Sequence, residues 1–315
     1  MTRKEIVFRT IEFKDPERLA LNSDMVHIGR GRLFKHLDAW TRQDDWGCIW
    51  KSLNPEKGDQ GQVIKHPLYD WNQFEKYIFP DPYAEGRFDG FINELEKIDR
   101  NEFFVMGGLG KGPMHLLDDL RSFEKYLEDI ILEPQRIEVL LNGIFNFLTG
   151  MVKQYGEFGL NAVSITDDQA IQTGPIFSMD LWKKYFKPRY KQLFDIAHNY
   201  NMKVYMHTCG KLDQHLIELH ECGVDIIDNK QPELWMNSTQ AELLKGKMTY
   251  STCIDIQTCV FNISLDDIDA EVSRLIKTLT IKEGGFIGTY YPGHDLNIEE
   301  DKKNRMIQAY KKFRW

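Results

Sequence analysis

The sequence has no long hydrophobic run, no block of basic residues and no CxxC pair. No stretch approaches the length of a membrane-spanning helix, and the first residues, Met-Thr-Arg-Lys-Glu-Ile, carry charges where a signal peptide has its apolar region. Lysine and arginine are dispersed through a chain of net charge -8, which argues against a nucleic-acid partner because phosphates bind basic surfaces. We therefore expect a cytoplasmic protein that binds neither membranes nor nucleic acids.

Cysteine is scarce and odd in number, which does not suit a disulfide framework. In a reducing compartment each thiol is either a small buried hydrophobic group or a metal ligand. Two of them are expected to be structural, because Cys222 precedes Gly223 at a predicted helix end and Cys259 lies in the apolar run Thr-Cys-Val-Phe. The full set is Cys48, Cys209, Cys222, Cys253 and Cys259.

From about residue 100 onward, short apolar runs alternate with longer amphipathic stretches, a pattern typical of βα units and a parallel sheet. Earlier strands are expected at Arg18–Asn22 and around Cys48–Trp50. The later strands are predicted at Phe103–Gly107, Ala162–Thr166, Val204–His207, Asp225–Asp228, Thr249–Cys253 and Phe286–Thr289. The sequence therefore predicts a single α/β domain over residues 1–315, a (β/α)8 TIM barrel. An open doubly wound sheet is the alternative, and it is disfavoured because no Gly-rich phosphate loop follows the early strand.

Helices are predicted at Thr2–Phe13 and at about 114–131, 134–156, 179–200, 211–222, 237–245, 266–281 and 298–312. Pro188 falls inside one of them and should kink it or divide it in two, because proline removes a backbone donor. Residues 1–100 are expected to form an N-terminal elaboration of the barrel. Within it, residues 52–87 are rich in Gly, Pro, Asp and aromatic residues and are predicted to be a long ordered loop over the barrel mouth.

Polar residues follow nearly every predicted strand, at the end where barrel active sites are built. His207 and Cys209 lie two residues apart at a strand terminus and so project to the same side, as zinc ligands would. Cys253 ends the second strand after them and is the expected third ligand, leaving one position open for substrate. Alternatively, Cys253 packs in the barrel wall while His207 and Cys209 only hydrogen-bond a ligand.

Asp167 and Asp168 follow another strand and are candidates for a further metal ligand or a general base. The alternative is that one of them caps the following turn. His294 lies beyond the last strand, where a proton donor would stand. The residues expected to contact substrate at the same mouth are Gln172, Lys230, Gln231, Asp255, Gln257, Tyr290 and Tyr291.

These motifs, in this order, resemble the uroporphyrinogen decarboxylase-like superfamily, and in particular its corrinoid-dependent methyltransferase branch. The resemblance covers most of the chain. Arg18–His27 lacks the arginine-rich segment with which true uroporphyrinogen decarboxylases hold their substrate's carboxylates. The matching stretches are Asp167–Ser178, Phe186–Lys191, His207–Gly210, Gly223–Asp225 with Gln231-Pro232, Asp255–Gln257 and Gly293–Asp295, with earlier matches at Thr2–Ile6, Asp15–Arg18, Asp45–Cys48, His66–Leu68 and Phe79–Pro82.

The resemblance implies a barrel enzyme that moves a methyl group from a small methylated donor, such as a methyl aryl ether, to the cob(I)alamin of a separate corrinoid protein. It also implies zinc as the Lewis acid. The methyltransferases that serve coenzyme M carry a distant cysteine where this sequence has Thr289, Tyr290 and Tyr291, whereas members that demethylate phenyl methyl ethers have more varied zinc ligands. One competing hypothesis is a metal-independent decarboxylase, with Asp168, Lys230 or His294 handling protons. The other is a non-catalytic small-molecule-binding or chaperone-like barrel that only partners a corrinoid protein.

Overall fold

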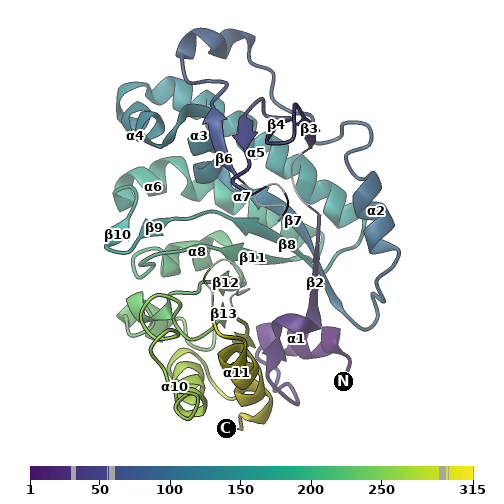
Figure 1. The fold of residues 1–315 in the computed structure, drawn as a ribbon, viewed down its shortest axis with the longest axis vertical. Helices are drawn as coiled ribbons and strands as arrows, with labels where there is room; N and C mark the ends of the chain where they lie inside the picture. The colour runs from purple at the N-terminus through teal and green to yellow at the C-terminus, as the bar shows by residue number, and fades with distance from the viewer. Residues whose placement is uncertain (30–32, 55, 57–60, 291–295, 297, 315) are drawn as a thin grey trace.

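The computed structural model describes residues 1–29, 33–54, 56, 61–290, 296 and 298–314. Within them, eight parallel strands form a nearly closed barrel in the order β1-β14-β13-β12-β11-β8-β7-β2 (Figure 1). This arrangement confirms the predicted (β/α)8 barrel and not the alternative, an open doubly wound sheet. Its strands are β1 (Ala20–Leu21), β2 (Met25–Ile28), β7 (Phe104–Lys111), β8 (Ala162–Thr166), β11 (Lys203–His207), β12 (Ile226–Asp228), β13 (Thr249–Thr252) and β14 (Phe286–Gly288).

Helices surround the barrel, and two predicted helices are each divided in two. The first breaks at Ser122, whose φ of 82° ends one helix, and the second breaks at Phe186, just before Pro188 at the start of the next.

No helix of the described residues combines the length and hydropathy needed to cross a membrane. The helices are α1 (Arg3–Ile11), α2 (Asp89–Leu95), α3 (Pro113–Arg121), α4 (Phe123–Leu132), α5 (Pro134–Glu157), α6 (Met179–Tyr185), α7 (Lys187–Asn199), α8 (Leu216–Cys222), α9 (Thr239–Leu243), α10 (Ile268–Leu279) and α11 (Glu300–Lys312). Shorter elements are η1 (Asn22–Asp24), η3 (Trp71–Lys76), η4 (Pro232–Leu234), β9 (Ala170–Ile171) and β10 (Gly174–Pro175).

One end of the barrel is closed by α1. Buried side chains of this helix pack with the apolar side chains that begin the strands inside the barrel, in the cluster Ile6, Val7, Ile11, Met25, Phe104, Ala162, Ile226 and Ile287. Because the strands are parallel, their carboxyl ends all lie at the opposite end. Any site built from strand termini therefore lies away from α1.

Side chains alternate along each barrel strand. In β11, Val204 and Met206 belong to the outer hydrophobic cluster, whereas Tyr205 packs against the inner one. Since residues two apart share a face, His207 points into the barrel with Tyr205. In the same way Asp228 follows Ile226 on the inner face of β12.

A second, antiparallel sheet lies in the N-terminal part, and the sequence analysis missed most of it. It has the order β3-β4-β5-β6, and Figure 1 shows it near α3 and α5. Trp46 packs edge-on against Phe147 of α5, with ring centroids 4.9 Å apart. The strand expected around Cys48 belongs to this sheet and not to the barrel, where β2 is the second early strand. The bounds are β3 (Phe34–His36), β4 (Thr41–Asp44), β5 (Ile49–Lys51) and β6 (Gln62–Lys65).

His215, just before α8, is a buried histidine whose two ring nitrogens have no hydrogen-bond partner among the described residues. Its ring packs edge-on against Trp182 at 5.3 Å. Burial lowers the pKa of His215 from 6.5 to about 4, with the charge of Glu218 acting in the opposite direction. The unfolded chain then binds this proton more tightly than the folded chain, so stability is lost as the pH falls through this interval.

We expect His215 to lower the free energy of unfolding by about 2 kcal/mol between pH 7 and pH 5. Urea unfolding of wild type and His215→Leu at both pH values measures this contribution. The variant should lose that part of the pH dependence, and His36→Leu, at an exposed position of β3, is the control. An unchanged pH dependence in His215→Leu would show that folding does not lower the pKa of His215.

Candidate metal centre

Three neighbouring strands bring their polar ends together at the barrel mouth. Asp168 follows β8 by two residues, His207 ends β11 and Asp228 ends β12. The register places His207 beside Thr166 on one side and beside Asp228 on the other. The parallel order of the strands therefore fixes which polar side chains are neighbours.

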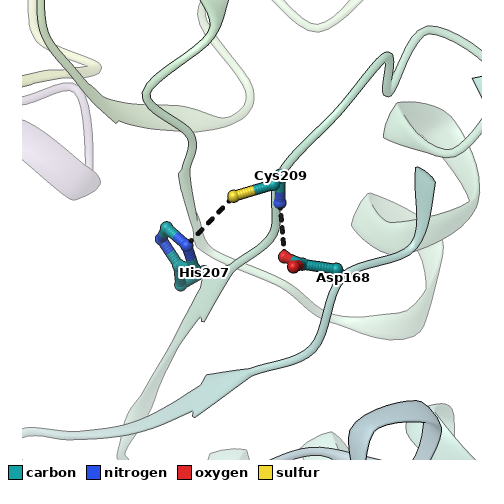
Figure 2. A group of neighbouring side chains, drawn as sticks. All are labelled: Asp168, His207 and Cys209. Carbon is teal, nitrogen blue, oxygen red and sulfur yellow. Dashed lines mark hydrogen bonds between the residues drawn. The ribbon is translucent and has the colours of Figure 1, made fainter. Parts of the chain in front are cut away.

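Asp168, His207 and Cys209 form a compact group of possible metal ligands, drawn in Figure 2. One ligand atom from each lies within 4.8 Å of the others, and all three side chains are partly exposed. Cys209 Sγ is 3.5 Å from His207 Nε2, and the Cys209 amide donates to Asp168 Oδ1 at 2.7 Å. Nitrogen, sulfur and carboxylate oxygen are the ligand atoms that zinc takes in proteins.

The chain turns sharply after Cys209, and Gly210 makes this turn possible. Its φ is 85°, and a Cβ atom there would lie 2.3 Å from the Ala170 carbonyl oxygen. A side chain at this position is therefore excluded both by backbone conformation and by space. The close approach holds the Cys209 loop against the segment that follows Asp168.

Asp228 hydrogen-bonds the ring nitrogen of His207 that is farther from Cys209. Its Oδ2 lies 2.5 Å from His207 Nδ1, and its Oδ1 accepts from Ser251 Oγ at 2.7 Å and from Lys230 Nζ. Burial opposes ionisation, but Lys230 and His207 hold the pKa of Asp228 well below its usual range. A carboxylate on Nδ1 leaves Nε2, the nitrogen nearer Cys209, for a metal.

The pKa values of the ligands follow from the same contacts. Burial favours the neutral form of His207, yet Asp228 and Cys209 raise its pKa to about 10, so a proton and a metal ion compete for Nε2. For Asp168, burial acts against the charge, but His115 and the Cys209 amide hold its pKa at about 2. His115 Nε2 lies 3.4 Å from Asp168 Oδ2.

Asp167 has a different environment from Asp168. It is fully buried and accepts from the Met114 and His115 amides at 3.2 and 3.0 Å, at the start of α3. Tyr190 also donates its hydroxyl to this carboxylate. These contacts fit the capping interpretation, although the capped helix is α3 and not the turn that follows in sequence.

The structure groups Asp168, and not Cys253, with His207 and Cys209. Cys253 is 1 % exposed and packs in the outer hydrophobic cluster between the strands and the helices. Its strand ends one residue earlier, at Thr252, so the alternation that would direct the thiol inward no longer applies. This environment fits the alternative in which Cys253 packs in the barrel wall.

Three of the residues expected to contact substrate are buried and bonded within the protein. Lys230 bonds to Asp228 and, at 3.4 Å, to Thr289 Oγ1, while Gln231 Oε1 accepts from the Gly210 amide at 2.7 Å. Asp255 caps the turn after β13, accepting from the Gln257 amide at 2.9 Å. All three side chains are therefore held by contacts within the protein, and their role at the mouth is structural.

The other predicted contacts are exposed or undescribed. Gln172 donates to Gln257 Oε1 at 3.2 Å, and both are exposed, as is Tyr290. Tyr291 and His294 lie outside the described residues.

The sequence analysis missed Asp228 and His115 as neighbours of the candidate ligands. Asp228 was visible as the last residue of a predicted strand, and the rule that strand ends converge would have found it. His115 gave no local signal, because it lies in a helix and reaches Asp168 only through the folding of α3 onto β8.

Comparisons with known proteins agree with this architecture. Residues 52–313 match the family described as Uroporphyrinogen decarboxylase (URO-D). No curated protein sequence gave a significant match. A methyltransferase from Methanosarcina mazei has a similar structure, with 17% identity, a TM-score of 0.64, and coverage of 84% of this chain and 75% of that chain. At this identity the likeness concerns the fold.

Weaker similarity extends to a beta-mannanase from the blue mussel Mytilus edulis, with 10% identity, a TM-score of 0.45, and coverage of 79% of this chain and 77% of that chain. An endo-beta-1,4-xylanase from Gloeophyllum trabeum has 14% identity and a TM-score of 0.42, covering 71% of this chain and 80% of that chain. Because the family match spans most of the chain, this protein belongs to the uroporphyrinogen decarboxylase (URO-D) family.

Proposed function

We propose that this protein is a zinc-dependent methyltransferase that moves a methyl group from a small methylated donor, a methyl aryl ether, to the cob(I)alamin of a separate corrinoid protein. The observation that carries the proposal is the group Asp168, His207 and Cys209 at the barrel mouth, supported by Asp228. The family match and the fold shared with a methyltransferase are consistent with it.

The donor set fits zinc. An imidazole Nε2, a thiol sulfur and a carboxylate oxygen lie close enough to share one ion, and the imidazole already has a carboxylate on its other nitrogen. When bound, zinc supplies Lewis-acid polarisation of the heteroatom that carries the methyl group.

The chain's own residues would then position the ligands and the donor. With a pKa of about 2, Asp168 carries no proton near neutral pH and suits a ligand better than a proton donor. The proposed proton donor is therefore His294. In the reaction, the methyl carbon leaves the ether oxygen without the bonding electrons, the cobalt(I) lone pair forms the carbon–cobalt bond, and the phenolate takes up the proton. The corrinoid protein would cover the mouth and exclude water.

The proposal predicts about one zinc per chain in purified protein. It also predicts formation of methylcobalamin, measured by its absorbance, when the protein is mixed with a methyl aryl ether and cobalamin reduced to the cob(I) state. Metal-free protein that converts a carboxylated pyrrole to its decarboxylated product would instead favour the decarboxylase. Absence of methylcobalamin with zinc-loaded protein and a panel of methyl donors would favour a binding protein.

A further inference from the structure

Large apolar side chains are exposed on one surface of the N-terminal part and of the helices next to it. Ile78, just after η3, is 86% exposed and Tyr69, just before η3, is 55% exposed. Both line a hollow of about 640 Å³ that lies outside the barrel. Exposed apolar surface of this extent marks an interaction site in many proteins. The other exposed members, on α4 and at the start of α5, are Phe123, Ile131, Leu132 and Val139.

Contacts between the elements join these side chains into one surface. The ammonium group of Lys125, on α4, lies 4.0 Å from the centre of the Tyr69 ring. Phe79, the neighbour of Ile78 in sequence, packs on α5, where a Cβ at Gly143 would lie 2.2 Å from its ring. The segment around η3 therefore lies directly against α4 and α5.

One end of this surface is basic. The register of the antiparallel sheet pairs Lys35 with Gln43, Gln43 with Ile49 and Ile49 with Lys65, so these residues share one face of the sheet. Lys51, two residues after Ile49, lies on the same face. Gln43, Ile49 and Lys65 also line the hollow. The three lysines are exposed, and none has an acidic partner among the residues that the structure describes.

The other end is acidic. Glu124 and Glu128 lie one turn apart on α4 and are both exposed. Neither forms an ion pair within the described part of the chain. In the view of Figure 1, α4 and β3 lie on either side of β6. The surface thus has unpaired lysines at one end, unpaired glutamates at the other and apolar side chains around a hollow between them.

This distribution of charge matches a second copy of the chain better than another partner. An acidic protein would match the lysines only, and a basic protein would match the glutamates only. An anionic membrane would be repelled by Glu124 and Glu128, and a flat bilayer would leave the hollow unfilled. In a twofold symmetric interface the same surface meets itself with its ends exchanged, so lysines of each copy face glutamates of the other.

We propose that this protein forms a twofold symmetric dimer through this surface. Ile78 and Tyr69 of both copies pack around the axis, and Lys51 and Lys65 of each copy face Glu124 and Glu128 of the other. The dimer does not depend on methyl transfer, because Asp168, His207 and Cys209 are not part of this surface.

Sedimentation equilibrium of the full chain tests the dimer. Wild type should have twice the chain mass of 37.0 kDa, with a dissociation constant that rises with salt. Ile78→Asp should be monomeric, because it places a charge from each copy at the apolar centre. Ile78 is exposed in the single chain, so this change should leave the fold intact, and thermal melting by circular dichroism verifies that.

Charge reversal tests the symmetry of the interface. Lys51→Glu with Lys65→Glu should raise the dissociation constant of the dimer by about tenfold or more, and Glu124→Lys with Glu128→Lys should do the same. Mixing these two double variants should restore a dimer, because acidic ends of one copy then meet basic ends of the other. The matched control is Lys311→Glu with Lys312→Glu, on α11 at the opposite end of the molecule in Figure 1, which should match wild type.

Three results would each overturn the proposal: a wild type with the mass of one chain, a dimer that persists in Ile78→Asp, or a mixture of the two double variants that stays monomeric. A monomeric wild type that sediments with vesicles containing phosphatidylserine would assign the surface to a membrane instead.

Discussion

Asp168→Ala is expected to remove zinc from the protein as completely as Cys209→Ala, whereas Cys253→Ala should retain about one zinc per chain. Asp168 and Cys209 belong to the group whose ligand atoms lie within 4.8 Å of one another. Loss of a direct ligand should weaken zinc binding by more than the roughly 10- to 100-fold typical of a supporting residue. Elemental analysis after dialysis and competition with a chromogenic chelator measure the stoichiometry and the affinity.

Removing a buried thiol lowers the stability of the protein whether or not the thiol binds zinc, so the comparison of zinc contents needs a matched variant. Cys222→Ala provides it, because Cys222 is also buried in the outer cluster, at the end of α8. Its zinc content should equal that of Cys253→Ala and of wild type. The opposite result, zinc lost from Cys253→Ala and kept in Asp168→Ala, would show that the Cys253 thiol, just after β13, is the third ligand.

The barrel could be predicted from the sequence because its strands carry a strong local pattern. The predicted strand Ala162–Thr166 coincides with β8, and Lys203–His207 extends the predicted one by a single residue. Each is a short apolar run that ends in polar residues. This pattern is expected because a barrel strand is buried on both faces, by helices outside and by side chains inside the barrel. Pro188 likewise marked the division between α6 and α7 through its missing backbone donor.

The N-terminal part lacked such a pattern. All three residues of β3 are exposed, so this strand has no apolar alternation to detect. β2 is only four residues long and follows a 3-10 turn. Short strands like these are stabilised by pairing with distant segments, which is information that local sequence does not contain.

At the metal centre, the spacing of residues along one strand predicted which side chains lie together. The sequence did not show which residue from a neighbouring strand joins them. His207 and Cys209 are two residues apart at one terminus, and the structure brings them together. The choice between Asp168 and Cys253 depended on how far each neighbouring strand extends. β13 ends before Cys253, whereas the segment after β8 returns toward the Cys209 amide. Such a difference of one residue is beyond the accuracy of predicted strand ends.

Asp228→Asn is expected to weaken zinc binding by about 10- to 100-fold. The two carboxylate oxygens of Asp228 accept from opposite sides, one from His207 and the other from Ser251 and Lys230. Asparagine has a single acceptor oxygen. If its amide nitrogen faces His207, Nδ1 must accept, the proton moves to Nε2, and the nitrogen nearer Cys209 loses the lone pair that would bind the metal.

In either orientation of the Asn amide, the buried Lys230 ammonium loses the carboxylate with which it pairs, which costs about 3–5 kcal/mol of stability. The double variant Asp228→Asn with Lys230→Met separates the two effects, because it removes the buried charge but leaves His207 without its carboxylate. It should regain stability against urea while zinc affinity stays low. Ser251→Ala, which removes only one bond to the far oxygen, should bind zinc nearly as wild type does. Wild-type affinity in Asp228→Asn would mean that another group sets the tautomer of His207.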